Sequence, residues 1–245
     1  MSECGLPRPC QPAVVAGDEV SSFGGQKAEH LGSVLGDGLV GVYFVGSAAL
    51  GGYVPGQSDL DVVAVCEKPI PPGRRPQMAE KVFALTADCP ARGLEFTLYR
   101  REAAGSDSTA AAFELNVNGG RAMDRSVHLD QSVEPGFWYV IDRAIAHRRG
   151  VVISGPSPES VFADVPRLVL VSAMAESMSW HRQHEGATLY SVLNAAGPGD
   201  SEPRASWARS SRAPNGAGAA GPIRGSSTPP SISATAGPRS WTRPR

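Results

Sequence analysis

Two aspartates, Asp59 and Asp61, open an apolar run in the stretch DLDVVAV. Alternate residues of a β-strand point to the same face about 6.6 Å apart, so both carboxylates would share one side of such a strand. Two charges at that separation repel each other by on the order of a few kcal/mol at an effective dielectric of about 20. A divalent cation between them would turn this repulsion into binding. Mg²⁺ fits best, because it takes one or two carboxylates and keeps positions for water and phosphate.

A Gly-Ser pair, Gly46 and Ser47, precedes the aspartates in the sequence. It stands where the expected strand LVGVYFVG gives way to a short helical turn, SAALGG. Free N–H groups at a helix start and the helix dipole can hold a phosphate, and glycine lets that phosphate approach the backbone. Each pair alone is common on solvated surfaces. The Gly-Ser and Asp-x-Asp pairs together, each at a strand end, predict a metal and triphosphate site.

A third acid, Glu95, lies within the apolar stretch GLEFTLYRR, which we expect to be a strand. Glu95 would share a face with Thr97 and Tyr99, while the apolar residues between them occupy the other face. If this strand pairs beside the Asp pair, Glu95 would complete a carboxylate cluster. Such a cluster can bind a metal ion or remove a proton from an attacking hydroxyl group.

These side chains need a framework of alternating strands and helices. Residues 17–36 have helix-like content, the strand LVGVYFVG follows, and DLDVVAV is the second strand. A loop rich in proline, a helix at QMAEKVFALTA and the strand GLEFTLYRR complete the unit. The pattern predicts an α/β (α+β) domain with a mixed sheet over residues 17–125.

The second half is richer in helical spacing. The stretches GFWYVIDRAIAHRRG, DVPRLVLVSAMAESMSWHRQH and ATLYSVLNAA are expected helices, and VVISGPSP is a short extended piece. We therefore expect an all-helical domain over residues 126–196. His181 and His184 could bind a metal, but a surface position is favoured because no nearby carboxylate or cysteine completes a set.

The two ends of the chain have a different composition. Residues 1–16 are expected to be a disordered leader. Residues 197–245 are rich in Gly, Pro, Ser, Ala and Arg and contain no Leu, Val, Phe or Met, so they cannot bury enough apolar surface to offset their ordering entropy. Two interpretations stay open. The segment is a disordered tail, or a frameshift has replaced the true end of an incomplete helical domain.

The overall composition excludes several classes of protein. The formal net charge is −1, which gives no basic excess of the kind that nucleic-acid-binding proteins carry. No window approaches the roughly 18 apolar residues of a membrane span, and the N-terminus lacks the order of a secretion signal. We therefore expect a cytoplasmic location, with the four cysteines as thiols.

The stretch GSAALGGYVPGQSDLDVVAV resembles the signature of polymerase-β-type nucleotidyltransferases: Gly-Ser, a spacer, Asp-x-Asp and a later acid on a strand. Within that superfamily the chain is most similar to the aminoglycoside adenylyltransferases that modify streptomycin and spectinomycin. The stretches LEFTLYR, FELNVNGG and IDRAIAHRRGVVISGPSPESVFADVPR support the likeness, which covers about residues 17–196. It implies a small nucleotidyltransferase domain at residues 17–125 and a substrate domain at 126–196.

The resemblance also implies an activity: Mg²⁺-dependent transfer of AMP from ATP to a hydroxyl of an aminoglycoside-type antibiotic, with release of pyrophosphate. One or two Mg²⁺ ions would bind, and the protein would be a monomer without nucleic-acid or membrane partners. The roles carried over are triphosphate binding by Gly46 and Ser47 with support from Ser58, metal binding by Asp59, Asp61 and Glu95, and general-base catalysis by Glu95.

Two alternatives remain. The chain could be an inactive, truncated member of that family, or a nucleotidyltransferase that acts on a protein, as antitoxin-like members do. Where the relatives of the streptomycin type carry an aromatic residue after the FEL-like stretch, this chain has Asn118, Gly119 and Gly120.

Overall fold

The computed structural model describes residues 17–184, which all lie in one compact unit. The predicted leader at 1–16, the predicted helix at 187–196 and the predicted tail at 197–245 lie outside the described residues. None of the helices in the described part is both long and apolar enough to cross a bilayer.

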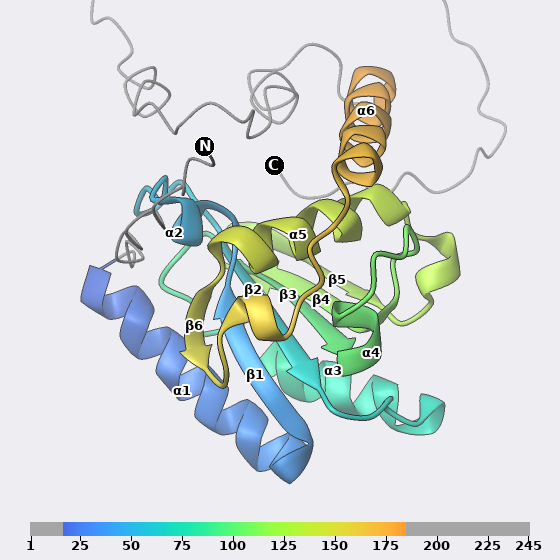
Figure 1. Cartoon of the computed structure of the whole chain (residues 1–245). Coiled ribbons are helices and arrows are strands. Elements are labelled where there is room, and N and C mark those ends of the chain that lie inside the picture. Colours follow the sequence, from blue (N-terminus) through green and yellow to red (C-terminus); the bar gives the residue numbers. More distant parts are fainter. Residues whose placement is uncertain (1–16, 185–245) are drawn as a thin grey trace, which may run out of the picture. The chain divides into compact units, whose positions relative to one another are not determined.

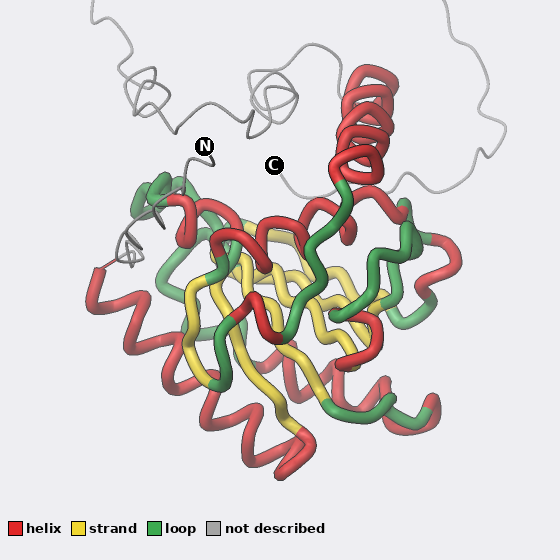
Figure 2. Tube along the Cα trace, viewed as in Figure 1, coloured by secondary structure: helices red, strands yellow, loops and turns green. Residues whose placement is uncertain are grey.

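The described residues form a mixed α/β fold around one six-stranded sheet (Figures 1 and 2). The strand order is β5-β4-β3-β2-β1-β6. Only the central pair, β2 and β3, is parallel, and every other neighbouring pair is antiparallel. The strands are β1 (Leu39–Phe44), β2 (Leu60–Cys66), β3 (Leu94–Arg100), β4 (Phe113–Gly120), β5 (Met123–His128) and β6 (Val151–Ser154).

Helices connect and cover these strands. They are α1 (Gly17–Leu35), α2 (Gly46–Leu50), α3 (Arg75–Ala84), α4 (Arg101–Ala104), α5 (Gly136–Arg149) and α6 (Arg167–His184). Short 3₁₀ turns lie at η1 (Gly36–Gly38), η2 (Pro72–Arg74), η3 (Gln131–Val133) and η4 (Pro158–Ser160). Helix α3 is the crossover that joins the two parallel strands, β2 and β3 (Figure 1).

The main hydrophobic core lies on the face of the sheet that α1 and α3 cover. Leu60, Leu94 and Leu98 project into it and are at most 1% exposed. Burial of each leucine contributes about 1.5–3 kcal/mol. The period-two alternation of β2 and β3 therefore fixes which of their side chains face away from this core, toward the other side of the sheet.

Helix α5 covers part of that other face. The Tyr139 ring of α5 packs on Phe113 of β4 with 4.9 Å between ring centroids. The guanidinium of Arg143 lies over the Tyr99 ring of β3, 5.7 Å from its centroid. Nearer to the beginning of β2 and β3 the same face carries polar side chains.

Most elements expected from the sequence are present. The helix at 17–36, the strands at LVGVYFVG, DLDVVAV and GLEFTLYRR, and the helices that became α3, α5 and α6 are confirmed. The expected face of Glu95 is also confirmed, because the alternating residues Leu94, Phe96 and Leu98 belong to the core.

The division expected at residue 126 differs from the structure. That boundary falls inside β5, and β6 pairs with β1, so residues from the expected all-helical part complete the sheet of the first part. Val151, Val152 and Ile153 are β-branched and favour a pleated strand. His181 is also buried rather than on the surface, at 2% exposure, because its ring packs against Trp138 and Trp180.

Candidate active site

The Gly46–Ser47 turn and the start of β2 meet at one end of the central strands. β1 runs antiparallel to β2, so the chain leaves β1 beside Asp61, and the Val45 N–H donates to the Asp61 carbonyl oxygen at 3.0 Å. Gly46 has φ +54°, in the left-handed region. A β-carbon on Gly46 would stand 1.9 Å from Asp61 Oδ2. The glycine thus lets the Asp61 carboxylate lie directly against the turn.

Ser47 follows in the first turn of α2. Its hydroxyl oxygen is buried and has no hydrogen-bond partner among the described residues. The Ser47 carbonyl accepts from the Gly52 N–H at 2.9 Å, and Gly51, in the left-handed conformation, ends the helix. A buried hydroxyl without a partner is costly in a folded protein, so it marks a position where a ligand atom would be stabilising.

Ser58 closes the loop that leads into β2. Its Oγ accepts from the Val54 N–H at 3.0 Å, and its own N–H donates to the Val54 carbonyl at 2.9 Å. The Ser58 carbonyl accepts from the Arg92 N–H at 3.1 Å, which ties the loop to the start of β3. In the structure, Ser58 therefore stabilises the loop before β2. Support of the triphosphate by Ser58 stays a prediction. Asp59, the next residue, is half-buried and lies just before the first residue of β2.

Asp61 and Glu95 are directly opposite each other in the parallel pair of β2 and β3. The register continues across the sheet, with Glu95 opposite Asn118 of β4 and Asn118 opposite Ser126 of β5. We call these four residues the polar row. Glu95 is 8% exposed and Asn118 is 4% exposed, so the middle of the row is buried, while Asp61 and Ser126 at its two ends are half-buried. Two neighbouring carboxylates in such surroundings favour a cation between them.

Asn118 was not among the residues predicted from the sequence to act, although FELNVNGG holds asparagines at alternate positions. Asn118 Oδ1 is buried and has no hydrogen-bond partner among the described residues. Asn116, in the next row, donates from Nδ2 to Thr97 Oγ1 at 2.9 Å and is satisfied. The difference between the two asparagines points to Asn118 as the one that is available to a ligand.

Gly119 and Gly120, which follow Asn118, allow neighbouring segments to pack closely against β4. A β-carbon on Gly120 would stand 2.3 Å from the Cα of Gly93, so the end of β4 lies directly on the turn before β3. A β-carbon on Gly119 would stand 2.6 Å from the Phe83 ring. This close approach keeps the beginning of β3, and with it Glu95, next to the end of β4.

The three expected metal ligands do not form a ready-made cluster. No group of three or more His, Cys, Asp or Glu side chains in residues 17–184 could hold a metal ion by itself. The register does bring Asp61 and Glu95 together, and Asp59 precedes Asp61 by two residues in the chain. One or two carboxylates completed by water and phosphate oxygens are the usual protein share of a Mg²⁺ site.

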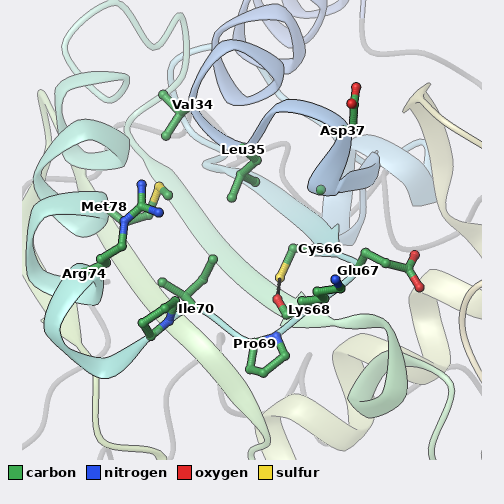
Figure 3. Close-up of a pocket in the computed structure, with 12 residues that line it drawn as sticks. Val34, Leu35, Asp37, Cys66, Glu67, Lys68, Pro69, Ile70, Arg74 and Met78 are labelled. Atoms are coloured by element: carbon green, nitrogen blue, oxygen red, sulfur yellow. Dashed lines mark hydrogen bonds between the residues drawn. The ribbon is translucent and has the colours of Figure 1, made fainter.

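A separate pocket of about 420 Å³ lies at the opposite end of β2 (Figure 3). It is lined in part by Leu35, Ile70 and Met78, with Cys66 at its wall. The Cys66 thiol donates to the Lys68 carbonyl at 3.2 Å and to the Tyr99 carbonyl at 3.3 Å. Burial raises the pKa of this thiol to about 12, so Cys66 is an inert core residue. The pocket contains none of the residues that the sequence predicts to act.

Of the comparisons with known proteins, the one with solved structures finds a similar protein. No protein-family model matches the chain, and no curated protein matches it. Among solved structures, the chain is similar to a spectinomycin adenyltransferase, AAD(9), from Enterococcus faecialis, which was crystallised with ATP and spectinomycin. The identity is 16% and the TM-score is 0.44. The alignment covers 66% of this chain and 66% of that one, slightly under two thirds of each.

Proposed function

We propose that this protein is a nucleotidyltransferase that transfers AMP from ATP to a hydroxyl group of a small acceptor. The observation that carries the proposal is the meeting of Gly46, Asp61 and Glu95 at one end of the central strands, with the Asp61 carboxylate against the Gly46–Ser47 turn. A phosphate-accepting turn, a metal-binding carboxylate and a base in neighbouring strands are what nucleotidyl transfer requires.

The residues fit a Mg²⁺ ion and a triphosphate. Asp61, which is half-buried, and Glu95, which is buried, are opposite each other, and the buried Ser47 hydroxyl lacks a partner among the described residues. Asp59, Asp61 and Glu95 would hold one or two metal ions, and Gly46 and Ser47, with Ser58 behind the loop, would hold the phosphates. Bound Mg²⁺ supplies charge stabilisation at the phosphate oxygens.

The chain's own part in the reaction is to position the reactants and to move one proton. Ser47 Oγ would donate to a phosphate oxygen, because it has no acceptor in residues 17–184. Glu95 would accept the proton of the acceptor hydroxyl, whose oxygen attacks the α-phosphorus while pyrophosphate leaves. Asn118 Oδ1, next to Glu95 in the register, would accept a hydrogen bond from the acceptor and orient it.

We propose an aminoglycoside-type antibiotic, similar to streptomycin or spectinomycin, as the acceptor. The polar row supports a hydroxylated and cationic molecule, since Glu95 and Asn118 Oδ1 present hydrogen-bond acceptors and negative charge. Action on a soluble antibiotic by a monomer in the cytoplasm, without nucleic-acid or membrane partners, is part of the same proposal.

The test measures binding and turnover separately. Titration calorimetry of the full chain with ATP and Mg²⁺ should give one binding event, and pyrophosphate release should appear when an aminoglycoside from a panel is added. Asp61→Asn should lose both signals, while Glu29→Gln, an exposed acid on α1, should keep both. Binding without turnover on any acceptor would contradict the transferase activity. Equal ATP binding by wild type and Asp61→Asn would contradict the site itself.

A further inference from the structure

We propose that Ser126 is the nucleophile of a second reactive site, activated by His128 and Glu134, which forms an ester with activated acyl compounds. The proposal is independent of nucleotidyl transfer. It rests on a chain of two contacts: His128 Nδ1 lies 2.6 Å from Glu134 Oε1, and His128 Nε2 is hydrogen-bonded to Ser126 Oγ.

The contacts assign a role to each ring nitrogen. A carboxylate can only accept, so Nδ1, which faces Glu134, is assigned the proton, and Nε2 is left as the acceptor. The lone pair of Nε2 then faces the Ser126 hydroxyl, which donates to it. This is the order of roles in a serine nucleophile, base and orienting acid.

The sheet places the first two of these side chains. Ser126 and His128 are two residues apart on β5, so they share a face, and their partners across the strand pair are Asn118 and Asn116. β5 is one of the two edge strands of the sheet, and both residues are partly exposed to solvent.

The third residue, Glu134, is positioned by a short 3₁₀ turn. The η3 turn precedes Glu134 and is capped by Asp130, whose Oδ1 accepts from the Ser132 N–H at 2.9 Å and from the Ser132 hydroxyl at 2.6 Å. The Glu134 side chain is 1% exposed, against 17% for His128. A carboxylate this deeply buried needs a partner, and the His128 imidazole is the one in contact with it, although neither Glu134 oxygen has a hydrogen bond of good geometry among the described residues. The arrangement is therefore built into the fold and does not depend on two flexible surface residues.

Ser126 is too far from Asp61 to take part in the metal and phosphate chemistry, although Asn118, which would orient the acceptor, is its direct neighbour across β4 and β5. In the polar row, Glu95 and Asn118 lie between Asp61 and Ser126, so three strand spacings, or about 14 Å at about 4.8 Å per strand, separate the two backbones. An in-line transfer needs reacting atoms at roughly 3–3.5 Å.

The reaction of Ser126 with an aryl ester balances without a further reactant. The Ser126 oxygen forms a bond to the carbonyl carbon of the ester, and its proton moves to His128 Nε2. The bond from that carbon to the aryl oxygen then breaks, and the departing aryl oxide takes the proton from His128. The products are an acyl ester on Ser126 and a free phenol, with no oxidation or reduction.

The experiment uses the full chain and p-nitrophenyl acetate. Release of p-nitrophenol should show a burst of one equivalent, and peptide mass spectrometry should locate one acetyl group on Ser126. Ser126→Ala should abolish the burst. His128→Gln should slow it by at least about tenfold, since a positioned base contributes on the order of 10²–10⁴ in rate. Glu134→Gln should also slow it, because it removes the charge that stabilises the imidazolium.

Ser160→Ala is the matched control, because Ser160 is exposed and its hydroxyl donates to a backbone carbonyl instead of a histidine. It should react like wild type. Circular dichroism and melting curves establish that each variant is folded, and Ser126→Thr, which keeps a hydroxyl, should retain part of the burst if Ser126→Ala loses it. An acetyl group on His128 or on lysines alone, or an unchanged burst in folded Ser126→Ala, would overturn the proposal.

Discussion

Gly46 and Asp61 lie so close that a β-carbon on Gly46 would stand 1.9 Å from the Asp61 carboxylate oxygen Oδ2. Real β-carbons do not approach an oxygen this closely, so any larger residue at position 46 must displace either the turn or the carboxylate. The contact joins the two halves of the proposed site, the phosphate-binding turn and the metal-binding acid. A substitution of Gly46 therefore tests this contact without a change in charge.

We expect Gly46→Ala to remove ATP binding while the protein stays folded. The substitution adds the steric conflict with Asp61 to the strain of a non-glycine residue at φ +54°, which costs on the order of 1 kcal/mol. The measurement is titration with ATP and Mg²⁺, with urea unfolding in parallel. Gly56→Ala is the matched control, because Gly56 also has a left-handed φ, +74°, but a β-carbon added there would meet no atom within 4 Å. Equal loss of binding in both variants would assign the effect to backbone strain alone.

Glu95→Gln should separate binding from chemistry. The amide keeps the shape of the side chain but cannot accept the proton of the acceptor hydroxyl, so turnover should fall by on the order of 10²–10⁴. ATP binding should weaken less than in Asp61→Asn, because Asp61 contacts the phosphate-binding turn and Glu95 lies one strand further away. The check is pyrophosphate release at saturating ATP and acceptor. A rate within about threefold of wild type would exclude Glu95 as the base.

The first half of the fold was predictable because its signals are local. LVGVYFVG, DLDVVAV and GLEFTLYRR are short apolar runs bounded by glycine, proline or charge, and strands of this kind need no tertiary information. The same alternation placed Glu95 on the opposite face from Leu94 and Phe96. The Gly-Ser pair at the end of one strand and the Asp-x-Asp pair at the start of the next then predicted that the turn and the carboxylates lie close together.

The second half was harder to predict because its signals are weaker or non-local. In β4 and β5 polar residues alternate with apolar ones, but the sequence alone does not reveal which side chains of other elements lie beside them, and β6 is only four residues long. The neighbours of Ser126 depend on the order β5-β4-β3, which no local pattern encodes. His181 was misplaced for a similar reason, since its burial depends on Trp138 of another helix.

Arg143 should be an anchor of α5. It is 1% exposed, it donates to the carbonyls of Ser108 and Ala110, and its guanidinium lies over Tyr99. Arg143→Ala would remove this donor from two partly buried contacts and open a cavity, which together cost on the order of a few kcal/mol. Loss of the buried charge offsets part of this cost, so we expect a net loss of about 3 kcal/mol in the free energy of unfolding, measured in urea. Arg149→Ala, at an exposed position of the same helix, should change it by less than about 1 kcal/mol.

The buried thiols give a pH-dependent prediction. Burial raises the pKa of Cys66 from 9.0 to about 12 and also raises that of Cys89. Because the folded pKa lies above the unfolded one, the stabilising effect of these protonated thiols is fully present below about pH 9 and is lost as the pH rises from 9 toward 12. The raised pKa lowers the thiolate fraction of Cys66 near pH 8 by about a thousandfold, so this thiol should resist a disulfide reagent until the protein unfolds.

The measurement uses Cys4→Ser/Cys10→Ser, which leaves Cys66 and Cys89 as the only thiols of the chain. Modification by the disulfide reagent at about pH 8 should then follow the urea unfolding curve, and adding Cys89→Ser should leave a single protected thiol. The free energy of unfolding should fall between about pH 9 and pH 11 and should fall less when Cys66→Ala is added. Fast modification of Cys66 in the folded protein would place this thiol in a site open to solvent, contrary to its contacts with the carbonyls of Lys68 and Tyr99.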